Sequence, residues 1–190
     1  MLRSLVLKNR SYRRFHQREH VATEVLRELV DLARQTASAA NLQPLKYILS
    51  NTPERNAAIF PHLGWAGYLR DWPGPAEGER PPAYVIILGD KTVARQFGCD
   101  HGIAAQTMAL GAAEKGLGCC MIGSIQRAVL AQVLGLDAAR FEILLVVAVG
   151  RPNEAVVLEE LGASESIKYY RDDQDAHHVP KRSLEEVIIQ

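Results

Sequence analysis

Cysteine is scarce in this sequence, which has only Cys99, Cys119 and Cys120 among its 190 residues. The number is odd, two of the three are adjacent, and no Cys-x-x-Cys spacing occurs. A disulfide framework needs matched cysteines and a thiolate zinc site needs a characteristic spacing, so the sequence favours neither. Thiols that stay reduced are typical of the cytoplasm, and we therefore expect a cytoplasmic protein.

Net charge and long apolar runs are also missing. Lysine and arginine together number 22, and so do aspartate and glutamate, so the formal net charge is zero. A neutral chain has no general affinity for nucleic acid or for an anionic membrane surface. The longest apolar stretch, residues 143–149, is too short to span a bilayer, and the early charges leave no room for a signal-peptide core. We expect a soluble protein that binds neither nucleic acid nor membrane.

The composition is that of an ordinary globular protein, with 47% hydrophobic residues, and the length suits a single domain over residues 1–190. Apolar residues at helical spacing predict helices over residues 23–36, 53–62, 93–116 and 125–134. In the last of these, Val129, Leu130 and Val133 are expected to face inward. Dense apolar runs predict strands over residues 47–50, 83–89, 118–122 and 142–149, and residues 187–189 could add a final strand.

Two segments depart from the regular pattern. Residues 64–82 hold four of the nine prolines and both tryptophans, so we expect an irregular excursion over the active site. The second half of the long helix is small or apolar on nearly every face and should be buried all round. Strands and helices alternate too rarely for a doubly wound sheet. We therefore predict an α+β fold, with a central mixed or antiparallel sheet flanked by helices.

Four short motifs could carry chemistry. Residues 9–15, NRSYRRF, combine guanidinium and hydroxyl donors, which suit a phosphate monoester. Residues 38–44, SAANLQP, are small enough for a flat ring to approach, and Asn41 has a donor and an acceptor for the edge of a heterocycle. Residues 121–124, MIGS, form a turn whose backbone N–H groups could meet a ligand, and residues 180–182, PKR, could add phosphate contacts. Taken singly, each motif also fits a plain solvated face, loop, turn or surface charge pair.

The order of these motifs resembles the nitroreductase family. The family pattern is an Arg-Ser-x-Arg-x-Phe opening, a Ser-x-x-Asn-x-Gln-Pro loop, a Gly-Leu-Gly turn leading to Ile-Gly, and a strand that ends in Gly-x-Pro. This sequence has RSYRRF at 10–15, SAANLQP at 38–44, GLGCCMIGS at 116–124, GRP at 150–152 and VPKR at 179–182. The resemblance to a small, FMN-dependent member of the family thus spans residues 9–182.

The resemblance implies an FMN-dependent NAD(P)H oxidoreductase, an intertwined homodimer with FMN at the subunit interface. Hydride would pass from NADH or NADPH to FMN and then, in a ping-pong cycle, to a nitroaromatic, a quinone or a similar conjugated acceptor. Because the flavin does the chemistry, no side chain is expected to act as an essential acid or base. The implied cofactor-binding residues are Asn9, Arg10, Ser11 and Arg13, with Lys181 and Arg182 at the phosphate, Ser38, Ala39, Ala40 and Asn41 from the partner chain, and Ile122, Gly123 and Ser124 over the ring.

Some of these residues carry a more specific expectation. Arg13 and Gly123 would tune the flavin, the first by stabilising the negative charge of its reduced form and the second through a backbone N–H. The substrate site could be walled by the aromatic residues of the excursion, although these could instead pack the excursion onto the body of the domain. They are Trp65, Tyr68 and Trp72.

Departures from the family pattern keep other functions open. Asn9 stands where the family often has arginine, and Arg151 where an aromatic residue is common. A flavin-binding or sensory module without nicotinamide turnover would fit these departures, and a structural dimer module without flavin would fit the small-residue helix over 100–116. A metal cluster in residues 172–178, a catalytic Asp100-His101 dyad and a redox-active cysteine are each less well supported than a solvated tail and inert packing.

Overall fold

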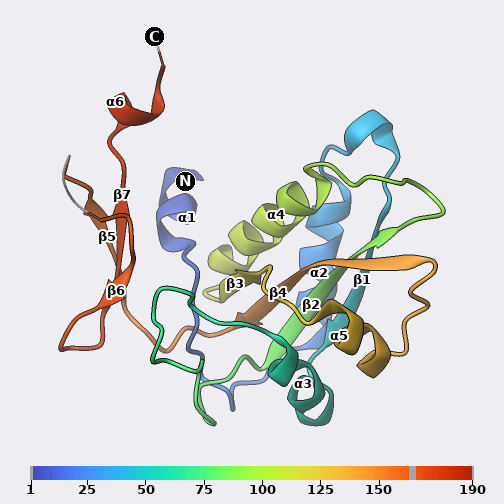
Figure 1. Cartoon of the computed structure of the whole chain (residues 1–190), viewed down its shortest axis with the longest axis horizontal. Coiled ribbons are helices and arrows are strands. Elements are labelled where there is room, and N and C mark those ends of the chain that lie inside the picture. The colour runs from blue at the N-terminus through green and yellow to red at the C-terminus, as the bar shows by residue number, and fades with distance from the viewer. Residues whose placement is uncertain (1, 163–165, 190) are drawn as a thin grey trace.

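A four-stranded antiparallel sheet forms the centre of the molecule, seen in a computed structural model that describes residues 2–162 and 166–189 (Figure 1). The sheet has the order β1-β2-β4-β3, and every neighbouring pair of strands is antiparallel. Apolar runs predicted these strands because both faces of the sheet are covered, and β2 is buried along its entire length. The fold is therefore α+β, as predicted. The strands are β1 (Leu45–Ser50), β2 (Ala83–Asp90), β3 (Gly118–Ile122) and β4 (Phe141–Gly150).

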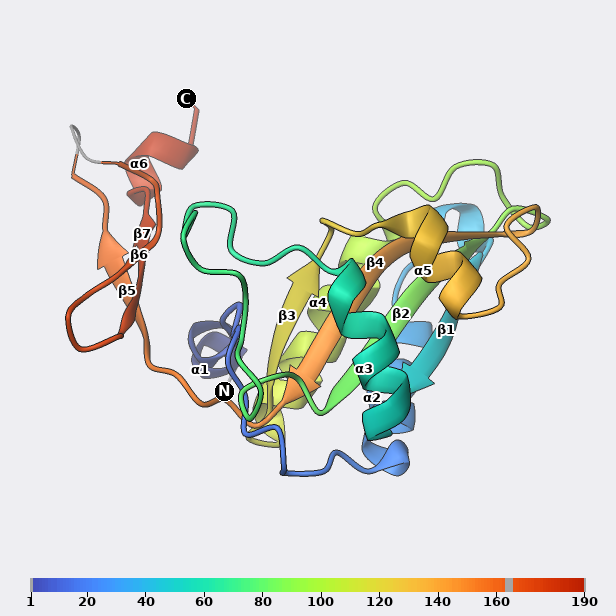
Figure 2. The same cartoon turned by 60° about the horizontal axis from the view of Figure 1, so that its bottom comes forward.

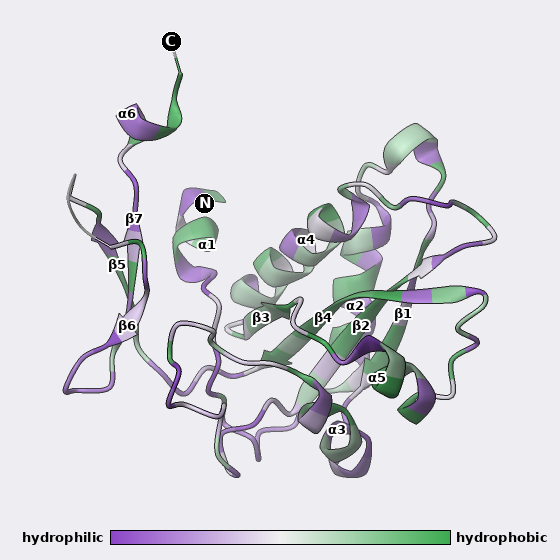
Figure 3. Cartoon of the chain, viewed as in Figure 1, coloured by the Kyte–Doolittle hydropathy of each residue, from purple (hydrophilic) through white to green (hydrophobic). Residues whose placement is uncertain are grey.

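Helices cover the two faces of this sheet (Figure 2). On one face, α2 (Thr23–Arg34) and α4 (Asp100–Glu114) pack against alternate strand residues such as Val85 and Ile87. On the other face, α3 (Pro53–Ile59) and α5 (Arg127–Val133) pack with the intervening residues of the same strands. The period of two in a strand thus divides one apolar run between two hydrophobic cores. Figure 3 shows the hydrophobic colours gathered on this sheet and on α4.

The predicted helix over residues 93–116 is wrong in its first part, because α4 begins only at Asp100. The Asp90 carboxylate accepts hydrogen bonds from the backbone N and hydroxyl of Thr92, at 3.1 and 2.6 Å, and this turn replaces a helical start. Gly98 then adopts a left-handed φ of 47°, which prevents a continuous helix through this segment. The helix is also not buried all round in one chain, since Ile103 is exposed.

Two further expectations are corrected by the structure. In α5 only Leu130 is buried, whereas Val129 and Val133 are 42% and 43% exposed, because this short helix covers the sheet along one narrow stripe. The suggested strand at residues 187–189 is absent from this part of the described chain. Instead Val187 ends the short helix α6 (Leu184–Val187), which begins with a reciprocal capping box between Ser183 and Glu186, and residues 188–189 have no regular secondary structure.

The two ends of the chain form structure that the apolar pattern did not predict. Near the N-terminus, α1 (Leu2–Lys8) lies between the body of the molecule and a small second sheet (Figures 1 and 2). This C-terminal sheet consists of β5 (Val156–Glu160), β6 (Tyr170–Arg171) and β7 (His177–Lys181), in the order β5-β7-β6. Its strands are short and mostly exposed or half-buried, and their only apolar run is the three residues 156–158 of β5, which is why the periodicity of apolar residues did not reveal them.

Two other features bear on function. Residues 64–82 contain turns and bends but neither helix nor strand. Within residues 2–162 and 166–189, no helix has the length and apolar character that crossing a membrane requires.

Candidate functional site

A cavity of about 480 Å³ lies where residues 9–15, here called the N-terminal arm, meet α4, β3 and the C-terminal sheet. The arm follows β3 closely: Ser11 forms a β-bridge with Cys119, and the Tyr12 N–H donates to the Cys119 carbonyl at 3.0 Å. Gly118 permits this approach, because a Cβ there would lie 2.4 Å from the Tyr12 ring. The cavity is lined by Val6, Asn9, Arg10, Ser11, Arg13, Gln106, Ala109, Cys119, Met121, Tyr169, His177, Val179 and Lys181.

The structure thus brings together residues that lie far apart in the sequence. Asn9, Arg10, Ser11 and Arg13 of the predicted arm share the cavity with Lys181 of the predicted C-terminal motif. Three of these five side chains are cationic, and no carboxylate lines the cavity among residues 2–162 and 166–189. A confined cationic surface of this kind attracts a phosphate or another oxyanion.

Other predicted residues lie elsewhere within one chain. Arg182 does not line the cavity and contacts Glu186 at 3.2 Å. Ile122 is buried in the core beneath α5, and Gly123 and Ser124 follow the end of β3 outside the cavity. Their turn is joined to the excursion, since the Gly64 N–H donates to the Ser124 carbonyl at 2.8 Å.

The loop at residues 38–41 is also remote from the cavity and is held at the start of α4. The Asp100 carboxylate accepts from the Ser38 hydroxyl at 2.6 Å and from the Ala39 N–H at 3.1 Å. Two residues of the loop, Ala40 and Asn41, have φ values of 49° and 53°, a backbone conformation that is unfavourable for residues with a Cβ. Such strain concentrates at functional sites, which keeps this loop a candidate. The same contacts show that Asp100 serves the loop rather than a dyad with His101.

Sequence reasoning missed His177, a buried residue that lines the cavity beside Arg13. The Arg13 guanidinium donates from Nη1 to His177 Nε2 at 2.9 Å, and it also lies over the Tyr169 ring, 4.6 Å from its centroid. Because Nε2 accepts, the imidazole proton belongs on Nδ1. Burial and the nearby charges of Arg13 and Arg171 lower the pKa of His177 to about 4. His177 is therefore neutral near pH 7 and fixes the direction of the Arg13 side chain.

We predict that His177 lowers the free energy of unfolding in acid. Since its folded pKa of about 4 lies below the ordinary 6.5, the unfolded chain binds a proton between these pH values that the folded chain does not. The stabilising contribution of His177 to the free energy of unfolding is therefore fully present above the unfolded pKa. It decreases by about 2–3 kcal/mol as the pH falls from the unfolded pKa toward the folded one. Urea unfolding near neutral pH and at about pH 4.5 should show a smaller acid loss for His177→Gln than for the natural chain.

Two controls isolate this effect. His20→Gln changes an exposed histidine and should lose stability in acid as the natural chain does. His178 acts in the opposite direction, because Asp172 and Glu159 raise its pKa and its contribution disappears as the pH rises through that value. Since His178 is present in all three proteins, an equal acid loss for His177→Gln and the natural chain would contradict the prediction.

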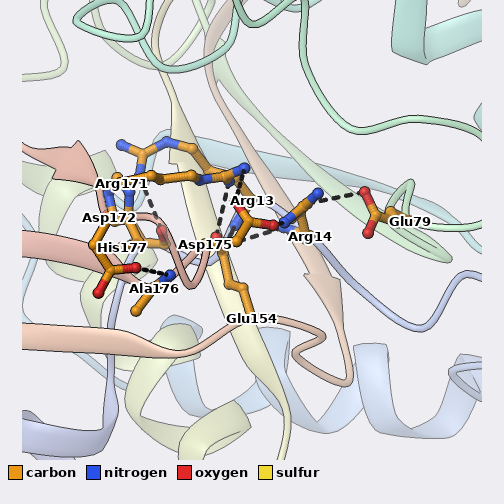
Figure 4. A network of polar contacts seen from close by, with 10 residues as sticks. Arg13, Arg14, Glu79, Glu154, Arg171, Asp172, Asp175, Ala176 and His177 are labelled. Carbon is orange, nitrogen blue, oxygen red and sulfur yellow. Dashed lines mark hydrogen bonds and ion pairs between the residues drawn. The ribbon is translucent and has the colours of Figure 1, made fainter.

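A buried carboxylate fixes the arm against the C-terminal sheet (Figure 4). The Glu154 side chain is 0% exposed, and its Oε1 accepts from the backbone N–H groups of Arg13 and Arg14. Its Oε2 accepts from Arg171 Nη2 at 3.1 Å. Arg14 continues the network to Glu79 at 2.9 Å and to Asp175. The Glu154 carboxylate therefore fixes the N-terminal arm and the C-terminal sheet, two walls of the cavity, relative to each other.

The three aromatic residues of the excursion pack onto other parts of the chain, and none lines the cavity. Trp65 lies against Phe60, with ring centroids 5.8 Å apart. Trp72 lies beneath the Arg171 guanidinium at 4.5 Å. Tyr68 contacts the Tyr169 ring at 4.9 Å and so joins the excursion to the cavity wall.

Other candidate chemistry finds a structural explanation. Burial raises the pKa of Cys119 to about 12 and that of Cys120 to about 11, so both thiols stay protonated and inert near neutral pH. In the C-terminal tail, His178 pairs with Glu159 and Asp172. The part of the chain that the structure describes holds no group of three or more His, Cys, Asp or Glu side chains that could bind a metal ion.

A family model described as the nitroreductase family matches residues 6–68 and 78–151, with a gap inside the excursion. No curated protein matches the sequence.

Three of the solved structures that share the fold show the extent of the similarity. A protein from Desulfovibrio desulfuricans, described as a nitroreductase and solved in complex with FMN, is 23% identical, with a TM-score of 0.71 over 100% of this chain and 95% of its own. A protein from Staphylococcus epidermidis described as an NAD(P)H:FMN oxidoreductase is 15% identical, with a TM-score of 0.74 and the same coverage. A protein from Exiguobacterium sibiricum, described as a nitroreductase and solved in complex with FMN, is 16% identical, with a TM-score of 0.66 over 81% of this chain and 89% of its own. Because the family model matches most of the sequence and the fold agrees, the chain belongs to the nitroreductase family.

Proposed function

We propose that this chain is an FMN-dependent NAD(P)H oxidoreductase whose cofactor binds in the cavity beside the N-terminal arm. Membership of the nitroreductase family supports flavin oxidoreductase chemistry in general. Two proteins of similar fold are complexes with FMN, and a third is described as an NAD(P)H:FMN oxidoreductase. The observation that carries the proposal is the cationic lining of the cavity, which includes no carboxylate among the described residues.

Unpartnered polar atoms test whether these residues fit FMN. Arg10 Nε and His177 Nδ1 are both buried and have no hydrogen-bond partner among the described residues. A buried donor without an acceptor costs about 1–3 kcal/mol, so a ligand that brings acceptors into this cavity would be stabilised by them. The phosphate and the polar ring edge of FMN are both rich in acceptor oxygens. The residues present therefore fit the cofactor.

The chemistry of each cavity residue suits it to a different part of FMN. Arg10, Ser11 and Lys181 would hold the phosphate, since together they offer a guanidinium, a hydroxyl and an ammonium group. Arg13 would lie at the pyrimidine edge of the flavin, where a fixed positive charge stabilises negative charge. Neutral His177 accepts from Arg13 and keeps the guanidinium aimed. When bound, FMN would supply hydride transfer from NADH or NADPH to a conjugated acceptor such as a nitroaromatic or a quinone.

The proposal includes a homodimer, with residues 38–41 and the turn at Gly123 and Ser124 completing the site; Ile122, which was also predicted there, is instead buried in the core of its own chain. Apolar side chains that one chain leaves exposed support it, because such surfaces are typical of subunit interfaces. They lie on α1, on α4 and in the C-terminal tail, where Ile189 is 97% exposed. The exposed residues include Leu2, Val6, Ile103, Val187, Ile188 and Ile189.

Anaerobic reduction of the purified, FMN-reconstituted protein tests this function. We expect a yellow protein whose visible flavin absorbance is lost on addition of NADH or NADPH and returns on addition of a quinone or a nitroaromatic. A protein that stays colourless after incubation with FMN would contradict the proposal. Flavin that is bound but reduced by neither nicotinamide would instead indicate a binding module, a result that Asn9 in the cavity lining would help to explain.

A further inference from the structure

A second cavity, of about 560 Å³, lies where the loop before α2, the start of α3 and the start of β2 meet. These segments gather at one end of the central sheet in Figures 1 and 2. The second cavity shares no lining residue with the cavity beside the arm. Its volume is within the usual range for a site that binds a small molecule. The proposed flavin chemistry does not use it.

Two arginines give this second cavity its charge. Arg18 and Arg80 both line it, and neither forms an ion pair with any residue in 2–162 or 166–189. The Arg80 guanidinium is held over the Phe60 ring, 4.4 Å from its centroid, and Arg80 Nε is buried without a hydrogen-bond partner. A fixed guanidinium with an unsatisfied buried donor is arranged to receive an acceptor.

The floor of the second cavity offers another donor. Tyr84 is completely buried and lines this cavity. Burial raises the pKa of this phenol, against the opposing charge of Arg80, so it stays protonated and can donate. His20 lines the same space.

The remaining lining limits the kind of ligand. Phe60, Pro53 and Pro82 form an apolar wall, which suits the hydrocarbon or aromatic body of an organic molecule. Glu77 is the single carboxylate among the described lining residues, and it opposes a ligand of high negative charge.

We propose that this second cavity binds a small organic anion. Its carboxylate or phosphate-ester group would meet Arg80 and Arg18, and its apolar body would lie against Phe60 and the prolines. This inference does not depend on the proposed oxidoreductase function, because the two cavities have separate linings.

Calorimetric titration of the full chain tests the inference with benzoate, phenyl phosphate and the neutral analogue benzamide. We expect saturable binding of benzoate or phenyl phosphate, with the stronger of the two identifying the preferred oxyanion, and no binding of benzamide. Arg80→Gln should weaken the binding about tenfold or more, because a charge-assisted hydrogen bond is lost. Glu77→Gln should tighten it, because a like charge is removed.

Matched controls keep the outcome decisive. Arg95→Gln removes an exposed arginine outside both cavities and should leave the affinity unchanged. Arg18→Gln gives a second test at an exposed residue if Arg80→Gln folds poorly, as judged by circular dichroism. The inference is overturned if neither anion binds, if binding survives both arginine substitutions, or if FMN displaces the bound anion.

Discussion

Replacing Glu154 by alanine is expected to lower the free energy of unfolding by about 3–5 kcal/mol. The carboxylate is fully buried and accepts from two backbone N–H groups and from the Arg171 guanidinium. Its removal leaves three donors without an acceptor, one of them charged, in a place that water reaches poorly. Urea unfolding followed by circular dichroism measures the loss.

Glu19→Ala is the matched control for this substitution. Glu19 pairs with Arg151 at 3.3 Å, but the two side chains are 47% and 62% exposed, so the expected loss is below about 1 kcal/mol. Glu154→Gln should fall between the two, because its amide oxygen can still accept from the arm. A loss for Glu154→Ala no larger than that for Glu19→Ala would show that the network does not hold the arm in place.

Reversing the charge of Arg13 is expected to weaken FMN binding at least about a hundredfold. Arg13→Glu removes a guanidinium donor and brings a carboxylate into a cavity whose described lining has none. The lost hydrogen bonds and the new repulsion toward the anionic edge of FMN act in the same direction. Quenching of FMN fluorescence on titration with protein gives the affinity.

Arg95→Glu makes the same change of charge at an exposed site and controls for long-range electrostatics. Arg10→Glu, at the proposed phosphate end, should reproduce the effect of Arg13→Glu without disturbing the contact with His177. If FMN affinity is unchanged in both variants, the cavity is not the flavin site.

The sequence predicted the central sheet because a strand that is buried on both faces is apolar along its length. Val85, Ile86 and Ile87 are all buried, so the run is apolar whichever core each residue faces. Residues 93–99 were misjudged because a side-chain turn at Asp90 and a left-handed glycine outweigh helical spacing. The C-terminal sheet shows no comparable apolar run, since its strands are short and mostly exposed or half-buried, and one of them is only two residues long.

The sequence motifs predicted only those parts of the candidate site that a single chain forms by itself. The arm and Lys181 do share a cavity. His177 was interpreted as part of a solvated tail, because nothing in the run of charges around it signals that Arg13 and Tyr169 would cover it. For Ser38 to Asn41 the expected neighbour is a second subunit, and contacts between chains leave no pattern in a single sequence.

The C-terminal sheet contributes one wall of the cavity, yet its buried residue His177, and Leu161 directly after β5, belong to neither hydrophobic core. Polar contacts such as those of Glu154 and the packing of Tyr68 and Trp72 attach it to the rest of the chain. A wall held in this way can open without unfolding the central sheet, as local units of proteins do. Ligand affinity at the cavity then includes the cost of closing that wall, and a bound ligand protects the wall from opening. The occupancy of the site and the local stability of the tail are thus two measures of one equilibrium.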